Sequence, residues 1–179
     1  MNLLTIPAFS TKQMFHVVVE SPRASNLKLK YEPRWEAMGI SRPLPVGLTF
    51  PFDWGFVPST RGPDGDPLDA FLMWDVASFP GVVVECRALG VLRVEQNAVN
   101  FDRSRRVRND RILGLPVTAR RESAWTDIDA IPLRIREECV QFTLAAAALE
   151  GKEVVVLGWG KPDEAIALIS ASTLTTADL

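Results

Sequence analysis

Three carboxylates lie within six residues in the segment DGDPLD, at positions 64–69, and an apolar run follows directly. Pro67 has a fixed φ and no amide hydrogen, and it biases Asp66 towards extended geometry. Gly65 permits a tight turn that lets Asp64 and Asp66 converge. Two carboxylates about 4 Å apart repel by roughly 4 kcal/mol at an effective dielectric near 20. The segment therefore predicts a loop that requires a cation or protons, and Mg²⁺ is the natural candidate because it prefers hard oxygen ligands.

A solvated turn and an EF-hand calcium loop are two other interpretations of this segment. A bare Asp-Gly-Asp is most often a solvated turn. An EF-hand calcium loop requires glycine at its sixth position, and counting from Asp64 that position is Asp69. The EF-hand is therefore excluded, whereas the full six-residue pattern is far more restrictive than a simple turn.

Length and composition indicate one globular unit. A chain of 179 residues can bury about 70% of its surface, so we expect residues 1–179 to form a single domain. The net charge of -2 argues against a nucleic-acid partner. Cys86 and Cys139 lack metal-ligand spacing and are expected to be reduced core residues. Residues 1–11 do not resemble a signal peptide, and no apolar run reaches the roughly 18 residues of a membrane span, so we expect a cytoplasmic protein.

Hydrophobic patterns predict a mostly β protein. Strands are expected over residues 14–20, 26–32, 112–115 and 153–159, with two neighbouring antiparallel strands within residues 80–95. One helix is expected over residues 131–150, capped by Asp129 and stopped by Gly151, and another over residues 162–172. This order predicts an α+β fold, a small closed antiparallel barrel with about two α-helices packed outside it.

Two basic features have alternative explanations. Lys28 and Lys30 share one face of their strand, which is typical of a solvated polar face. The segment 97–108 is rich in arginine and predicts a solvated loop, although a phosphate-rich partner stays open as an alternative.

The pattern at residues 64–69 resembles the signature of the soluble family I inorganic pyrophosphatases. Three further segments resemble motifs of that family: ESPR at residues 20–23, FPFDWGF at residues 50–56 and VVVLGW at residues 154–159. The likeness spans roughly residues 17–172. It implies a five-stranded OB-like barrel, Mg²⁺-dependent hydrolysis of pyrophosphate to two phosphates with more than one ion per site, and a homo-oligomer, either dimer or hexamer.

The resemblance also implies roles for single residues. Metal ligands would be Asp64, Asp66, Asp69, Glu20 in an outer shell, and Asn109 through a neutral oxygen. Phosphate would be held by Lys28, Lys30, Arg42, Arg111 and Trp54, where either lysine can carry the family's lysine role. Asp66 would also deprotonate the nucleophilic water.

Several positions depart from the family pattern. Gln96 and Asn109 stand where the family has aspartates, Trp54 replaces a tyrosine, and alanines at residues 145–148 replace a Tyr-Lys pair. We therefore expect weakened hydrolysis, and Glu95, Asp102 and Asp110 stay open as replacement carboxylates. The alternatives are a catalytically silent relative that binds metal and phosphate compounds or acts through assembly, and a hydrolase of another phosphoanhydride.

Overall fold

The structure is a computed structural model that describes residues 1–98, 105–148 and 150–175. Its strands are β1 (Met14–Ser21), β2 (Leu27–Glu32), β3 (Ala37–Pro43), β4 (Asp53–Phe56), β5 (Asp69–Leu72), β6 (Val83–Asn97), β7 (Arg106–Arg108), β8 (Arg111–Pro116) and β9 (Val154–Gly160). Its helices are the α-helices α1 (Leu133–Ala148) and α2 (Pro162–Ser172) and the short 3₁₀ helices η1 (Leu3–Thr5) and η2 (Ile128–Ala130).

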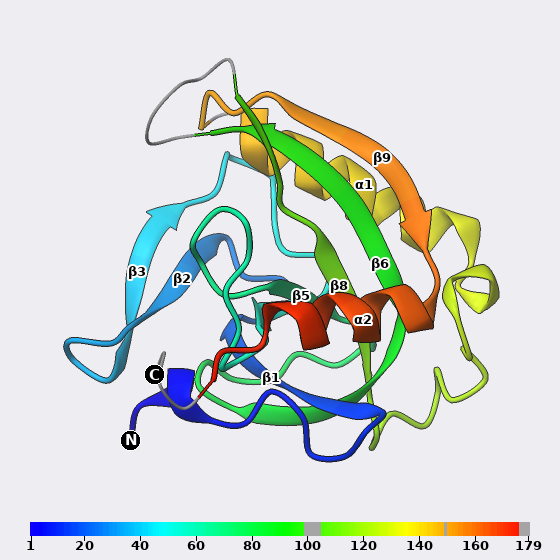
Figure 1. The fold of residues 1–179 in the computed structure, drawn as a ribbon. Coiled ribbons are helices and arrows are strands. Elements are labelled where there is room, and N and C mark those ends of the chain that lie inside the picture. The colour runs from blue at the N-terminus through cyan, green and yellow to red at the C-terminus, as the bar shows by residue number, and fades with distance from the viewer. Residues whose placement is uncertain (99–104, 149, 176–179) are drawn as a thin grey trace.

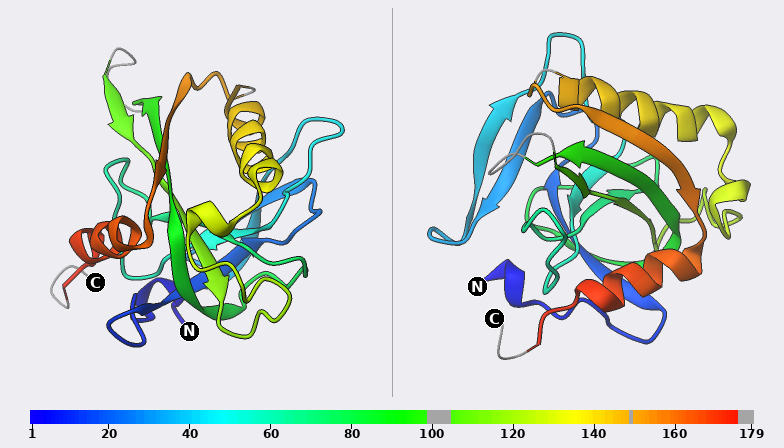
Figure 2. Two further views of the ribbon diagram at one scale, coloured as in Figure 1. Left: turned by 90° about the vertical axis from the view of Figure 1, so that its right-hand side faces the viewer. Right: turned by 45° about the horizontal axis from the view of Figure 1, so that its top comes forward.

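Five strands form a closed ring in the order β1, β4, β5, β8, β6, because β1 pairs with both β4 and β6 (Figure 1). β7 and β9 extend the sheet from β6, and β2 and β3 form a separate hairpin beside the ring (Figure 2). The predicted closed five-stranded barrel is confirmed. One pairing differs from the antiparallel prediction, since β5 and β8 run parallel. Between β5 and β8 the chain forms β6 and β7. Parallel strands require a long connection of this kind, and it lets β8 run in the same direction as β5.

β6 is one continuous strand of 15 residues, whereas the sequence predicted two neighbouring strands in this region. Its first half pairs with β1 and its second half with β9, so a single strand serves both ends of the sheet. The register shifts between Ala88 and Gly90, where φ of Gly90 is +154°. A Cβ at this glycine would lie 2.4 Å from the carbonyl oxygen of Gly160. The irregularity therefore bends β6 instead of ending it.

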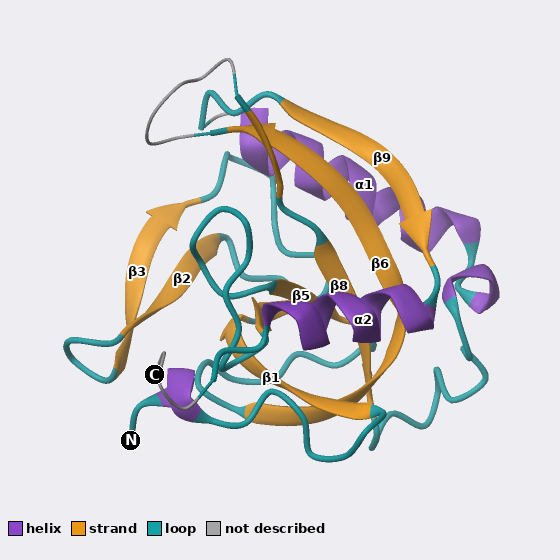
Figure 3. Ribbon diagram, in the orientation of Figure 1, coloured by secondary structure: helices purple, strands orange, loops and turns teal. Residues whose placement is uncertain are grey.

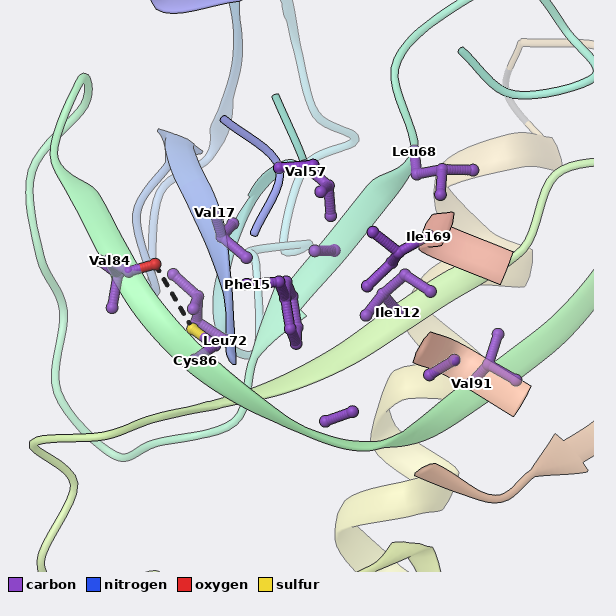
Figure 4. Packing of buried hydrophobic residues seen from close by; sticks show 14 of the residues in the cluster. Phe15, Val17, Val57, Leu68, Leu72, Val84, Cys86, Val91, Ile112 and Ile169 are labelled. Carbon is purple, nitrogen blue, oxygen red and sulfur yellow. Dashed lines mark hydrogen bonds between the residues drawn. The ribbon is translucent and has the colours of Figure 1, made fainter. Parts of the chain in front are cut away.

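The two α-helices cover opposite faces of the sheet. Along β5, Ala70 and Leu72 pack in the cluster that includes Ile169 of α2, whereas Phe71 packs in the cluster that includes Phe142 of α1. Figure 4 shows the first of these clusters, where Ile169 lies beside Ile112 of β8. Alternate side chains of β5 thus pack into two different hydrophobic cores, because successive residues of a strand point to opposite faces. Burying one such apolar side chain stabilises the fold by about 1.5–3 kcal/mol.

The helix boundaries test the predicted caps. α2 has the predicted bounds, and it lies across β6 (Figure 3). α1 begins at Leu133 instead of 131, and the predicted cap Asp129 lies one turn earlier, in η2. There Asp127 is the cap, because its side chain accepts hydrogen bonds from two backbone N–H groups of η2. In the described parts of the chain, no helix is long and apolar enough to cross a membrane.

Candidate active site

The carboxylate segment forms a loop that leads directly into β5. Gly65 has a φ of +92°, and its N–H donates to the carbonyl of Gly62 at 3.0 Å, which closes the predicted turn. The Gly62 N–H in turn donates to the carbonyl of Asp66 at 2.7 Å. Asp69 is the first residue of β5 and lies opposite Arg111 in the parallel β5–β8 pairing. The loop is therefore anchored to the ring at the point where its last carboxylate begins a strand.

Each of the three carboxylates has a different partner. Both oxygens of Asp66 accept from the Lys30 ammonium at 3.1 Å, and Asp69 forms an ion pair with Arg111 at 2.7 Å. Asp64 accepts from the backbone N–H of Asp66 at 3.2 Å. Burial raises the pKa of the Asp64 carboxyl above its usual range, and the negative charge of Asp69 adds to this shift. Two neighbouring cations thus offset part of the repulsion within the loop.

Four cations approach the loop from three other directions. Lys28 and Arg42 lie opposite each other across the β2–β3 hairpin, and Arg111 comes from β8. Burial lowers the pKa of the Lys28 ammonium, and the Asp69 carboxylate opposes that shift. The positive charges of Arg42, of Arg111 and of Lys152, which lies between α1 and β9, lower the Lys28 pKa further. The structure therefore brings Lys28 into the cluster of phosphate-binding candidates, while Lys30 pairs with Asp66 at its edge.

These groups line a small cavity of about 100 Å³. Its lining combines the acidic loop with the cations and with the substituted positions, and includes Lys28, Arg42, Trp54, Asp64, Asp66, Asp69, Gln96, Asn109, Arg111 and Lys152. A larger cavity of about 540 Å³ adjoins it and shares Lys28, Asp66 and Asp69. Glu20 and Lys30 line only this larger cavity, together with the aromatic side chains Tyr31 and Trp35. The predicted site residues are thus gathered around two connected spaces.

Two buried donors in the smaller cavity have no hydrogen-bond partner within the described residues. They are Nε1 of Trp54 and Nε of Arg111, and the Arg111 guanidinium lies 5.3 Å from the centre of the Trp54 ring. Buried donors are nearly always satisfied in native proteins. Both donors belong to residues that line the smaller cavity, although the two atoms themselves are closed to solvent.

Most of the positions expected to depart from the family pattern line the smaller cavity. Gln96 of β6 is buried, and Asn109 Oδ1 accepts a hydrogen bond from the Arg111 guanidinium. Ala146 and Ala147 of α1 line the smaller cavity. Of the three replacement carboxylates, Asp110 accepts from the backbone N–H of Val94 at 2.8 Å and is thereby committed to β6.

The remaining replacement candidates are placed differently. Glu95 lies opposite Arg108 in the β6–β7 pairing, and Asp102 falls outside the described residues. The arginine-rich segment is described only in part, and there Arg108 pairs with Asp110 at 2.7 Å. Two residues that sequence reasoning missed also line the smaller cavity, Glu150 and Lys152. Their one signal is that they flank Gly151, the predicted helix stop.

The site is suited to a divalent cation in its chemistry. Within the described ranges, no three Asp, Glu, His or Cys side chains come together in an arrangement that could hold a metal ion. The fit is one of chemistry alone, because Asp64, Asp66 and Asp69 line the cavity and offer the hard carboxylate oxygens that a divalent cation such as Mg²⁺ prefers. Lys30 and Arg111, which pair with Asp66 and Asp69, are cations with which an anionic ligand can also interact.

Comparisons with known proteins identify the family of this chain. A sequence model described as inorganic pyrophosphatase matches residues 17–176. A curated inorganic pyrophosphatase of Thermus thermophilus is 34% identical over 162 residues, 88% of this chain and 88% of the relative. The crystal structure of inorganic pyrophosphatase from Thermus thermophilus has a TM-score of 0.86 and 32% identity, covering 96% of this chain and 97% of that one. An inorganic pyrophosphatase structure from Coxiella burnetii has a TM-score of 0.83 and 28% identity, covering 93% and 97%.

Fold, site and comparisons together define a hydrolase of phosphoanhydrides. The chain belongs to the soluble family I inorganic pyrophosphatases, as the residues at positions 64–69 implied. Membership implies pyrophosphate as the substrate and a divalent metal ion as the cofactor.

Proposed function

We propose that this protein hydrolyses inorganic pyrophosphate to two phosphates with Mg²⁺ as its cofactor, at a reduced rate. The observation that carries the proposal is the smaller cavity, whose lining combines the three-carboxylate loop with the cations Lys28, Arg42, Arg111 and Lys152. Carboxylates opposite cations suit a phosphate ligand that arrives with its metal. The location of this activity is proposed to be the cytoplasm.

The proposed roles follow from the contacts. Asp64, Asp66 and Asp69 are the metal ligands, with Glu20 behind them and Asn109 as a neutral oxygen donor. Bound Mg²⁺ supplies a Lewis acid that lowers the pKa of a water molecule. Asp66 is the base that takes the proton from the attacking water, and it is exposed enough at the cavity wall to reach solvent.

The cations hold the substrate and offset the charge that develops on it. Lys28, Arg42 and Arg111 lie in the smaller cavity and bind phosphate oxygens, and Lys30 supports them from the larger one. Trp54 stands in place of the family's tyrosine and borders the substrate through its ring, which lies 5.3 Å from the Arg111 guanidinium. Donors placed in advance at such positions stabilise developing charge without reorganisation.

The reduced rate follows from the substituted positions. Loss of one placed donor or charge commonly costs about 10²–10³ in turnover, and such losses within one site do not add. Gln96 and Asn109 are neutral, and Ala146 and Ala147 offer the cavity neither hydroxyl nor charge. We therefore expect turnover below the roughly 10 s⁻¹ median for enzymes.

A second candidate function is favoured by the larger cavity. Its aromatic wall of Tyr31 and Trp35 and its volume of about 540 Å³ exceed what pyrophosphate alone requires. A phosphoanhydride with an organic group could place its phosphates at Lys28 and the organic part against this wall.

Steady-state phosphate release tests both candidates and the silent alternative. Pyrophosphate, a nucleoside triphosphate and polyphosphate are each compared with and without Mg²⁺. We expect Mg²⁺-dependent release that is fastest with pyrophosphate. Asp66→Asn should lower it by about 10²–10⁴-fold, whereas Asp163→Asn, an exposed position on α2, is the matched control. Absence of release from every substrate would establish a silent relative, and turnover above the median would show that other residues fill the substituted roles.

A further inference from the structure

The turn that follows α1 directs two charged side chains into the smaller cavity. Gly151 has a φ of +64°, and the N–H of Lys152 donates to the carbonyl of Ala147 at 3.2 Å, which ends the helix with a left-handed cap. Glu150 and Lys152 flank this glycine, and both line the cavity. The capped turn therefore holds the two side chains on the same side.

The Glu150 carboxylate connects two cations of the cavity. Its Oε2 lies 2.7 Å from the Lys152 ammonium, and its Oε1 contacts the guanidinium of Arg42. The three side chains are only 21–26% exposed. A carboxylate held at once by a guanidinium and an ammonium has the contacts that a phosphate group makes with the same cations.

The surrounding charges explain why these cations attract an anion. Burial lowers the pKa of the Lys152 ammonium, and the charge of Arg111 lowers it further. Lys152 and Arg42 both act on Lys28 in the same way. Like charges brought together in a partly buried cavity are stabilised by any anion that enters it. Glu150 is such an anion, supplied by the protein itself.

We infer that Lys152 is a further phosphate-binding residue and that Glu150 competes with phosphate for Lys152 and Arg42. The inference rests on the proposed function in one respect, that the smaller cavity is where the phosphates bind. A phosphate that enters displaces the Glu150 carboxylate and takes over both cations. Glu150 thereby weakens substrate and product binding, and Lys152 provides from the turn a positive charge that the alanines of α1 lack.

If Glu150 competes with phosphate for Lys152, substitutions at these two positions should have opposite effects on the binding of inorganic phosphate. Calorimetry with Mg²⁺ present measures this binding. Glu150→Gln keeps the shape and removes the competing charge, so the Kd should fall about fivefold, as expected for loss of partly exposed ion pairs. Lys152→Met removes the cation, and the Kd should rise about tenfold. Glu153→Gln is the matched control, because it removes the same charge from a side chain that is 86% exposed, and it should leave the Kd unchanged.

Kinetics separate competition from positioning. If Glu150 competes, Glu150→Gln lowers KM for pyrophosphate with little change in kcat. If it instead holds Arg42 and Lys152 in place, the same variant raises KM or lowers kcat, and the inference is overturned.

The binding readout also keeps this inference distinct from the activity. Unchanged phosphate binding in either variant overturns it, as does a wild-type protein that binds no phosphate. Opposite shifts in Kd without any turnover would support the inference while contradicting the proposed hydrolysis.

Discussion

Glu20 illustrates how burial changes the chemistry of a single carboxyl group. The backbone N–H of Tyr31 donates a hydrogen bond to it at 2.8 Å, which favours the charged form. Loss of hydration outweighs this bond, so burial raises the pKa of Glu20 from its usual 4.5 to about 7. The charge of Asp69 acts in the same direction. Burial therefore favours the protonated form of this carboxyl.

The Glu20 pKa predicts a pH-dependent stability. Between pH 4.5 and 7 the folded protein keeps the Glu20 proton, whereas the unfolded chain has released it. The free energy of unfolding should therefore fall as pH rises through this window, by on the order of 3 kcal/mol. Glu20→Gln stays neutral and should lose this dependence. Urea unfolding of both proteins with a chelator present, from pH 4.5 to about 8, measures the difference.

The control for this experiment is Glu137→Gln, which changes an exposed carboxyl on α1. It should follow the wild-type pH dependence. Identical pH dependence in Glu20→Gln and wild type would contradict the shifted pKa.

Two strands bring the neutral substitutions to the site. Gln96 lies near the end of β6, and Asn109 lies between β7 and β8, where its N–H donates to the carbonyl of Val94 at 2.9 Å. Both side chains line the smaller cavity. The backbone of these elements therefore brings both positions to the cavity, where their side chains carry no charge.

Restoring these charges should raise the rate. Asn109→Asp places a carboxylate beside the Arg111 guanidinium, which favours its charged form. Together with Gln96→Asp it should increase Mg²⁺-dependent kcat for pyrophosphate by about tenfold or more. Steady-state phosphate release measures the change. Gln141→Glu, an amide-to-acid change on an exposed face of α1, is the control, and a double variant no faster than wild type would show that neutrality here is not what limits turnover.

Exposed apolar side chains characterise the surface of the whole molecule. Trp35 and Ile40 on the β2–β3 hairpin are each 69% exposed, and Phe79 is 75% exposed. The hairpin projects from the ring (Figure 2). Large exposed apolar side chains such as these can contribute to contact with another protein surface.

We therefore predict a homo-oligomer. Light scattering at micromolar concentration should return a mass that is a multiple of 19.8 kDa. Trp35→Ser should shift the distribution towards smaller species if the hairpin contributes to the contact. A wild-type mass of 19.8 kDa over the whole concentration range would contradict the prediction.

Sequence alone was sufficient for the features that depend on neighbouring residues. The turn at Gly65, the bounds of α2 and most of the strands were predicted, because turns, caps and strand periodicity are local properties. The family was also predicted from residues 64–69. The positions of Lys28, Arg42 and Arg111 around one cavity agree with that prediction.

Only the tertiary structure decided which side chains meet across the fold. The parallel pairing of β5 with β8 places Arg111 against Asp69, and it was not predicted because register and direction depend on a long crossover. The continuity of β6 was not predicted either, and at Gly90 its backbone approaches Gly160 so closely that a side chain there would clash. Glu150 and Lys152 reach the cavity only because α1 packs against the ring, a contact between segments distant in sequence. Such long-range contacts have no signature in any short stretch of the chain, since their energy comes from surfaces that folding alone brings together.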